Sequence, residues 1–264
     1  MIWIVFYLLA GGFVGFFAGM LGIGGGMTLV PILAALFAAQ HLAPDHVVHL
    51  ALGTGMASIV FTSAASARAH ARLGAVDYKV FKGLAPGMVV GGLGSSLASS
   101  WVDQRLLAMA FALIVYAGAT QMLLNRKPTA ARTIPGTPVL LAVGLAIGVV
   151  CGLVSAGGAF LTVPYMLWCG MSMHRAIGTG ALLGIPVAVV GTLGYIFAGW
   201  GVPHLPAQAL GFVHLTALAA LVCASVLTAP LGARAAHRLP VLKLKRIFAL
   251  LLYLLASKML FTYW

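Results

Sequence analysis

The sequence predicts an all-α integral membrane protein made of two inverted-topology repeats, each a broken-helix hairpin followed by three transmembrane helices. Three observations lead to this prediction: long apolar runs, a glycine-rich pattern that occurs twice, and basic loops placed differently in the two copies. Of the 264 residues, 62% are hydrophobic and 7% are charged, whereas globular proteins carry about 25% charged residues. Uncharged runs of about 18 residues are what a bilayer core about 30 Å thick requires.

The charge balance is strongly basic, with 15 Lys and Arg against 3 Asp and Glu and a formal net charge of +12. In a soluble protein this balance would favour nucleic-acid binding. Here the basic residues lie in short loops between apolar runs, which is typical of the positive-inside rule and of contact with anionic lipid. We therefore expect the lipid bilayer and a small anionic solute as partners and no nucleic acid, and we leave oligomerisation open.

A repeat becomes visible when the chain is shifted by 133 residues, which places Pro31 on Pro164. At this shift five glycines and a Val-Pro pair coincide: Gly11, Gly15, Gly19, Gly24, Gly25, Val30 and Pro31 fall on Gly144, Gly148, Gly152, Gly157, Gly158, Val163 and Pro164. At a shift of 125, Gly53-Thr54-Gly55 falls on Gly178-Thr179-Gly180. The matches predict a first repeat over residues 1–124, a cytoplasmic linker over 125–137 and a second repeat over 138–264.

Each repeat begins with an apolar helix that a glycine-rich break interrupts. The first repeat predicts helices over 3–21 and 27–39, with a break at 22–26, and then helices over 47–66, 81–100 and 105–124. The second predicts helices over 138–154 and 159–169, with a break at 155–158, and then 176–199, 207–230 and 246–262. The two short helices would rise only about 16–20 Å and are too short to cross a bilayer alone.

The loops predict the orientation of these helices. Loops 67–82, 125–136 and 231–246 are rich in Lys and Arg and should be cytoplasmic, whereas loops 40–46, 101–104 and 200–206 are poor in both and should face outward. If each broken pair is counted as one element, the basic loop follows the second element of the first repeat but the third element of the second repeat. The second repeat is therefore expected upside down in the cell (inner) membrane, with both termini on the outer side.

The breaks are the predicted substrate site. Irregular backbone at membrane depth is tolerated where protein covers it or where it lines a cavity, and transporters with inverted repeats bind substrate at such breaks. A half-helix start also offers unpaired N–H groups and the positive end of a helix dipole to an anion. The predicted substrate-binding residues are Gly22, Gly24, Gly25, Gly26, Thr28, Thr54, Ser58, Ser155, Gly157, Gly158, Ala159 and Thr179.

Simpler interpretations exist for each of these features. The breaks would also fit structural bends without a ligand, and Thr54 and Thr179 would also fit backbone capping. The glycines at four-residue spacing before each break, which share one helix face, are interpreted as a surface for close helix packing.

Titratable groups are scarce inside the predicted helices. All three acids, Asp45, Asp77 and Asp103, fall in loops. His214, inside the predicted helix 207–230, is the most interior titratable residue and is a candidate for proton coupling, with a packed neutral histidine as the alternative. The sequence contains no evident nucleophile and base pair, metal cluster or phosphate loop, so we expect no enzyme, no cofactor and no metal site.

Several segments, in order over nearly the whole chain, resemble the TauE/SafE sulfite exporter family, also called the toluene sulfonate uptake permease family. These segments are GMLGIGGGMTLVPIL, ALGTG, ARLGAVDY, GLVSAGGAFLTVPYML and APLGARAAHRLP. The resemblance implies a cytoplasmic-membrane transporter of sulfite, organosulfonates or related small anions. The family pattern covers Gly22, Gly24, Gly25, Gly26, Pro31, Gly157, Gly158 and Pro164, and the second copy has Ser155 and Ala159 where the first has Gly22 and Gly26.

The predicted function is a secondary transporter that moves small anions by alternating access at a midplane site formed by the two breaks. A passive anion channel and a non-transporting membrane partner protein are the alternatives. The sequence leaves open the exact substrate, the direction of transport and the coupling ion.

Overall fold

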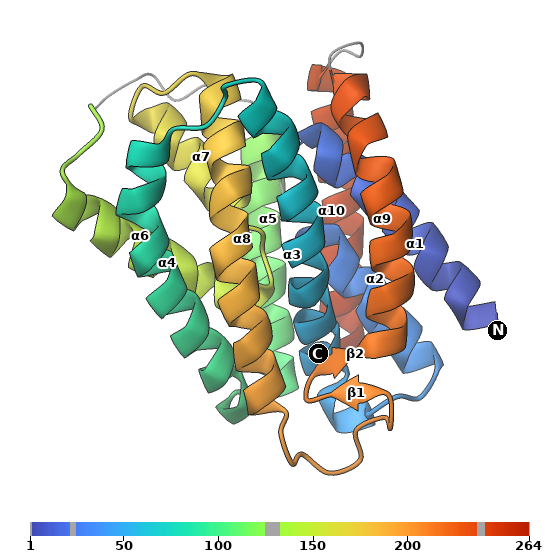
Figure 1. Cartoon of the computed structure of the whole chain (residues 1–264). Helices are drawn as coiled ribbons and strands as arrows, with labels where there is room; N and C mark the ends of the chain where they lie inside the picture. The colour runs from blue at the N-terminus through green and yellow to red at the C-terminus, as the bar shows by residue number, and fades with distance from the viewer. Residues whose placement is uncertain (1, 22–24, 125–132, 237–240, 264) are drawn as a thin grey trace.

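The structure is a computed structural model of the whole chain and describes residues 2–21, 25–124, 133–236 and 241–263. The described residues form ten α-helices and a short two-stranded hairpin (Figure 1). The helices are α1 (Ile2–Leu21), α2 (Gly26–Ala39), α3 (Val47–Arg72), α4 (Tyr78–Ala98), α5 (Gln104–Leu124), α6 (Thr137–Val154), α7 (Ala159–Trp168), α8 (Met173–Ala198), α9 (Leu215–Ala236) and α10 (Val241–Tyr263). The antiparallel strands are β1 (Ala209–Leu210) and β2 (Val213–His214).

Seven segments of the described chain are long and apolar enough to cross a membrane, which confirms the prediction of a multi-pass helical membrane protein. They are Ile2–Met20, Pro44–Arg72, Gln104–Leu124, Thr137–Val154, Met173–Ala198, Leu215–Gly232 and Arg246–Tyr263. The two short helices predicted after the breaks are also present, with 14 residues in α2 and 10 in α7. Neither reaches the length of about 20 residues that spanning requires.

Helices α3 and α8 lie at the centre of the bundle (Figure 1). In the same view α4 and α6 lie on one side of this central pair, α1 and α9 lie on the other, and α5 and α10 lie behind it. The pair α5 and α10 is joined by a hydrogen bond of 2.7 Å between the hydroxyls of Tyr116 and Ser257. The Tyr116 and Tyr253 rings also contact each other, with their centroids 5.4 Å apart.

The glycines before each break make the side pairs possible. A Cβ placed on Gly11 would lie 2.5 Å from the Leu221 carbonyl oxygen of α9, and one on Gly144 would lie 2.3 Å from the Leu84 carbonyl oxygen of α4. The other glycines of the two faces, Gly15, Gly19, Gly148 and Gly152, approach α9 or α4 as closely. The predicted role in close helix packing is therefore confirmed, since only glycine leaves room for such backbone approach.

Predicted boundaries are wrong by three residues or more at the starts of α4, α8, α9 and α10 and at the ends of α3 and α9. Helix α3 continues past the predicted end at residue 66 to Arg72, because no Gly or Pro occurs between residue 66 and Gly74 to end it earlier. The helix predicted from residue 207 begins instead at Leu215, because Gly211 has φ +54° and turns the preceding chain into the β1–β2 hairpin. A side chain at Gly211 would meet the Ile196 carbonyl oxygen of α8 at 2.1 Å. His214 therefore ends β2 rather than lying inside a helix.

Candidate functional site

The two helix breaks meet in the middle of the bundle. A Cβ on Gly26, the first residue of α2, would lie 2.0 Å from the Ser155 carbonyl oxygen, so the two backbones are in direct contact. Ser155 ends α6 in the left-handed region with φ 47°, and its hydroxyl donates a hydrogen bond to the Leu52 carbonyl of α3. The Tyr195 hydroxyl of α8 donates to the Gly152 carbonyl oxygen at 3.0 Å, close to the same helix end.

The first break leads into α2 through Gly25, which has φ 74° and precedes the helix. This conformation favours glycine because a side chain would be strained there. The Gly25 carbonyl accepts the Thr28 hydroxyl at 2.9 Å and the Leu29 N–H at 3.0 Å. Thr28 thus uses its hydroxyl inside its own helix. The other predicted residues of this break, Gly22 and Gly24, lie outside the described residues.

The second break leads into α7 through Gly157 and Gly158. The Gly157 carbonyl accepts the Phe160 N–H at 3.1 Å, and the Gly158 carbonyl accepts both the N–H and the hydroxyl of Thr162, at 3.1 and 2.7 Å. Ala159 begins the helix and is buried against Gly180 of α8. The N–H groups of the first turn point back toward the break, where a helix start is positive.

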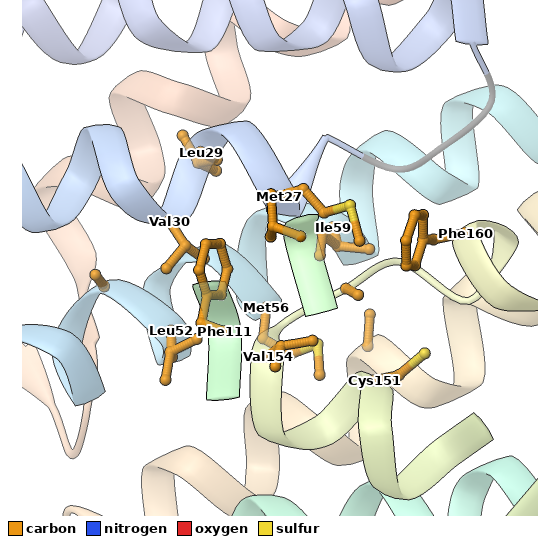
Figure 2. Close-up of a cluster of buried hydrophobic side chains, with 14 of the residues drawn as sticks. Met27, Leu29, Val30, Leu52, Met56, Ile59, Phe111, Cys151, Val154 and Phe160 are labelled. Atoms are coloured by element: carbon orange, nitrogen blue, oxygen red, sulfur yellow. The ribbon is translucent and has the colours of Figure 1, made fainter. Parts of the chain in front are cut away.

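The space between the breaks is filled by apolar side chains. Figure 2 shows Met27, Ile59 and Phe160 close to the start of α2 and the segment that leads to α7, with Met56 and Val154 beside them. All five side chains are buried. The described parts of the two breaks are therefore in contact through backbone and through buried apolar side chains.

The two Gly-Thr-Gly motifs border the breaks, since a Cβ on Gly55 would lie 3.9 Å from Ser155 Cβ and one on Gly180 would lie 3.0 Å from Ala159 Cα. The threonine of each motif forms a cross-link that we call a threonine clamp. In the lower clamp, Thr54 Oγ1 accepts the His214 N–H at 2.9 Å. In the upper clamp, Thr179 Oγ1 accepts the Asp77 N–H at 2.8 Å. These bonds agree with backbone capping as the role of both threonines. They leave each hydroxyl hydrogen available for a further partner.

The glycine before each threonine allows the clamps to close. A Cβ on Gly53 would lie 2.2 Å from the Phe212 carbonyl oxygen, and a Cβ on Gly178 would lie 2.0 Å from the Ala75 carbonyl oxygen. The clamped residues His214 and Asp77 also cap the next helix. His214 Nδ1 accepts the Ala217 N–H of α9 at 3.1 Å. Asp77 Oδ1 accepts the Lys79 and Val80 N–H groups of α4 at 3.1 and 3.2 Å.

His214 is buried in an aromatic setting just before the candidate span Leu215–Gly232. Its ring lies 5.4 Å from the Phe37 ring and 6.3 Å from the Tyr7 ring, measured between centroids. Burial lowers the pKa of the imidazole because the charged form would be desolvated. Since Nδ1 accepts a hydrogen bond, the neutral ring carries its proton on Nε2.

A cavity that the sequence analysis did not predict lies beside the second break. Its lining combines three hydroxyl residues of α3 with small residues of α1, the break, α7 and α8: Thr62, Ser63, Ser66, Ala18, Gly157, Ala159 and Ala181. Its volume of about 10 Å³ accommodates about one water molecule. The signal in the sequence was the run Thr62-Ser63-Ala64-Ala65-Ser66, in which the hydroxyl residues share one face of a membrane helix. Ser58, which was predicted, is buried one turn earlier on α3.

Comparison with known proteins identifies the family. The model of the family described as sulfite exporter TauE/SafE matches residues 7–259. The chain belongs to the TauE/SafE family. This confirms the resemblance noted in the sequence, and TauE/SafE proteins are transporters rather than enzymes.

Individual relatives agree with this membership. The chain is 34% identical over 257 residues to a probable membrane transporter protein of Haemophilus influenzae, covering 97% of both chains. It is 28% identical over 199 residues to the probable membrane transporter protein YdhB of Bacillus subtilis, covering 70% of this chain and 76% of the relative. No solved structure matches significantly. This TauE/SafE member is thus a multi-pass membrane transporter.

Proposed function

We propose that the protein is a secondary transporter that moves small anions, sulfite or organosulfonates, across the cytoplasmic membrane by alternating access at the meeting point of the two breaks. The observation that carries this proposal is the contact between Gly26 and Ser155, which brings the start of α2 against the end of α6, where the second break begins. Half-helix starts attract anions, and transporters with repeated halves place substrate between them. The family description supplies the sulfur oxyanion as the substrate class.

The pairing of helices supports two inverted repeats over residues 1–124 and 138–264, joined by the linker 125–137. Helix α1 packs by its glycines against Leu221, Ser225 and Ala229 of α9, and α6 packs by its glycines against Leu84, Met88 and Gly92 of α4. The glycines of the two pairs are 133 positions apart and the partners 137 apart, as from Leu84 to Leu221. In both pairs the first helix of one half packs on the fourth helix of the other half, and a twofold relation between the halves would produce this arrangement.

The threonine clamps follow the same exchange. Thr54 and Thr179 are 125 positions apart, and the residues whose N–H groups they accept, Asp77 and His214, are 137 positions apart. Each clamp therefore joins the third helix of one half to the start of the fourth helix of the other half. Two such links at opposite ends of the bundle are suited to guide a rocking motion of the halves, because one can open while the other stays closed.

The distribution of charge supports an orientation with both termini on the outer side. Figure 1 shows the end of α3, the start of α4 and the end of α9 at one end of the bundle, and the β1–β2 hairpin and both chain ends toward the other. The first of these ends carries the basic residues that border the loops, among them Arg68, Arg72, Lys79 and Lys82. We assign this end to the cytoplasm by the positive-inside rule. The same field concentrates anions there.

The proposal is tested by transport in proteoliposomes with leucine at each break. A side chain on Gly25 would have φ 74° and meet Val14 Cγ1 at 2.6 Å, and one on Gly158 would meet Met88 Cε at 2.9 Å. We expect Gly25→Leu and Gly158→Leu to insert but to reduce sulfite uptake to background. Gly94→Leu is the matched control, because its side chain would enter open space.

The outcomes separate the proposal from its alternatives. Wild-type uptake that is driven above the sulfite gradient and lost in both break variants supports a secondary transporter. Uptake that never exceeds the gradient identifies a passive channel. Normal uptake by both leucine variants would overturn the assignment of the breaks, and a wild-type protein that moves no sulfur oxyanion would overturn the transport proposal.

A further inference from the structure

The hydroxyl-lined cavity beside the second break has the character of a ligand site. We infer that the transported oxyanion is held in this cavity, by the hydroxyls of Ser63 and Ser66 on α3 and the N-terminal turn of α7. This inference rests on the proposed function and assigns its substrate contacts. It also restricts those contacts to one of the two breaks.

The first argument is that both serine hydroxyls lack a partner. Ser63 is only 3% exposed and lines the cavity, and it makes no hydrogen bond within the described part of the chain. The Ser66 Oγ atom is buried and is also without a hydrogen-bond partner among the described residues. A buried unpaired hydroxyl costs free energy, so the Ser66 hydroxyl, with Ser63 lining the same cavity, indicates a ligand that pairs with them.

The second argument is the position of the hydroxyls relative to α7. The cavity lining includes Gly157 and Ala159, which flank the start of this 10-residue helix. A Cβ on Gly184 would lie 2.6 Å from Ser63 Oγ and 3.8 Å from the Gly158 nitrogen, so the Ser63 hydroxyl and the Gly158 N–H both lie near the same point of α8. An anion there would receive O–H donors from α3 and face the positive end of the α7 dipole.

The third argument is that the equivalent positions of α8 carry no hydroxyl. The α8 positions that lie 125 residues after Thr62, Ser63 and Ser66 are Val187, Ala188 and Gly191, which carry no hydroxyl. The space beside Gly191 is occupied by Met56, whose Cε would lie 2.5 Å from a Cβ at this glycine. The hydroxyl donors of α3 therefore have no counterpart at the equivalent positions of α8.

The chemistry of the lining matches a sulfur oxyanion held by neutral donors. The cavity lining contains no Lys or Arg side chain, so binding would depend on hydrogen bonds and the helix dipole and not on an ion pair. Such a site releases its anion more readily than a charged one, which suits transport. Because the volume is about 10 Å³, room for about one water molecule, the cavity must widen when the anion enters.

The test compares three purified variants with wild type, using sulfite as the probe. Ser63→Ala removes one of the two serine hydroxyls and Ser63→Ala/Ser66→Ala removes both. Ser66→Thr keeps a hydroxyl at position 66. Ser96→Ala is the matched control, because Ser96 is fully buried on α4 and its hydroxyl is already bonded to the Gly92 carbonyl at 2.7 Å. The readouts are the half-saturating sulfite concentration for uptake by proteoliposomes and the melting temperature without sulfite.

We expect Ser63→Ala to raise the half-saturating concentration about tenfold and the double variant to raise it further. Ser66→Thr and Ser96→Ala should stay within about twofold of wild type. Without sulfite, the Ser63→Ala protein should melt at or above the wild-type temperature, because it loses an unpaired buried hydroxyl. A purely structural serine would instead lower the melting temperature and leave the half-saturating concentration unchanged.

The failure of this inference differs from the failure of the proposed function. If wild type transports sulfite and both Ser63 variants match Ser96→Ala, the cavity is not the anion site and the transporter proposal stands. If wild type transports no sulfur oxyanion, both are overturned together. If the double variant fails to fold, Ser63→Ala alone decides, since it must show the loss of apparent affinity at wild-type stability.

Discussion

The first and second helix breaks have nearly the same glycine pattern but different surroundings. At the first, Gly26 starts α2 directly against the Ser155 carbonyl oxygen and leaves no room for a side chain. At the second, the equivalent position is Ala159, whose methyl group packs beside Gly180 and borders a cavity with three hydroxyl residues. A similar glycine pattern thus leaves no space at the start of α2 and a small hydroxyl-lined cavity at the start of α7.

The largest expected effect comes from exchanging the residues at these two equivalent positions. In Gly26→Ala the new Cβ would lie 2.0 Å from the Ser155 carbonyl oxygen, so two backbones must move apart. We expect a loss of at least about 3 kcal/mol of unfolding free energy, at the upper end of overpacking effects. Ala159→Gly should lose only about 1 kcal/mol, from the greater freedom of glycine in the unfolded chain.

Thermal melting in detergent, followed by size-exclusion chromatography, measures this difference. Gly12→Ala serves as a control on α1, because its Cβ would meet only a side-chain methyl group at 3.8 Å. Equal melting temperatures for Gly26→Ala and Ala159→Gly would show that a side chain is tolerated equally well at both positions. The proposed difference between the two breaks would then be wrong.

Much of the fold was predictable because helix length, glycine spacing and charge placement are local properties of a membrane sequence. Helix α1 begins and ends within one residue of the prediction, and the short helices α2 and α7 were found from the glycine breaks before them. The β1–β2 hairpin was missed because residues 207–215 are apolar enough to resemble the start of a helix. What turns this segment is the positive φ of Gly211 against α8, which is a tertiary feature.

The site was predictable only in part, for a similar reason. The sequence located both breaks from their glycines, although only Gly25 of the first break has a positive φ, and the positive φ of the second break belongs to Ser155. It did not indicate that the Thr54 and Thr179 hydroxyls accept N–H groups from the opposite half, or that Ser63 is buried without a partner. Both facts depend on which helix lies opposite α3 and α8, and hydroxyl residues have the same local pattern in either role.

An intermediate effect is expected from the two threonine clamps, which differ in burial. The His214 N–H that Thr54 accepts is buried, whereas the Asp77 N–H that Thr179 accepts is only part-buried. Thr54→Val should therefore lower the free energy of unfolding by about 1–3 kcal/mol, the range for a buried donor left without an acceptor. Thr179→Val should cost less, about 1 kcal/mol, because water can reach Asp77 and replace the bond.

Melting curves of the two valine variants, each beside its serine variant, test this ranking. Thr54→Ser and Thr179→Ser keep the acceptor oxygen and should remain close to wild type. A larger fall in melting temperature in Thr179→Val than in Thr54→Val would mean that the upper clamp stabilises the protein more than the lower clamp, which would contradict the expected ranking.

The smallest expected effect concerns the residues held by the clamps, because one of them titrates near neutral pH. Burial lowers the pKa of the His214 imidazole below its ordinary value of about 6.5. The folded protein therefore holds the neutral ring while the unfolded chain takes up a proton, so the contribution of His214 is complete above pH 6.5 and is lost as the pH falls below it. The slope cannot exceed about 1.4 kcal/mol per pH unit for one proton.

His214→Asn isolates this contribution, because the asparagine oxygen can accept the Ala217 N–H as Nδ1 does but carries no charge at any of these pH values. We expect the fall in melting temperature between pH 7.5 and pH 5.5 to be smaller in His214→Asn than in wild type. Asp77→Asn at the opposite clamp should leave that fall unchanged. The same pH dependence in wild type and His214→Asn would show that the pKa of the imidazole is the same in the folded and the unfolded protein, which would overturn the statement that burial lowers it.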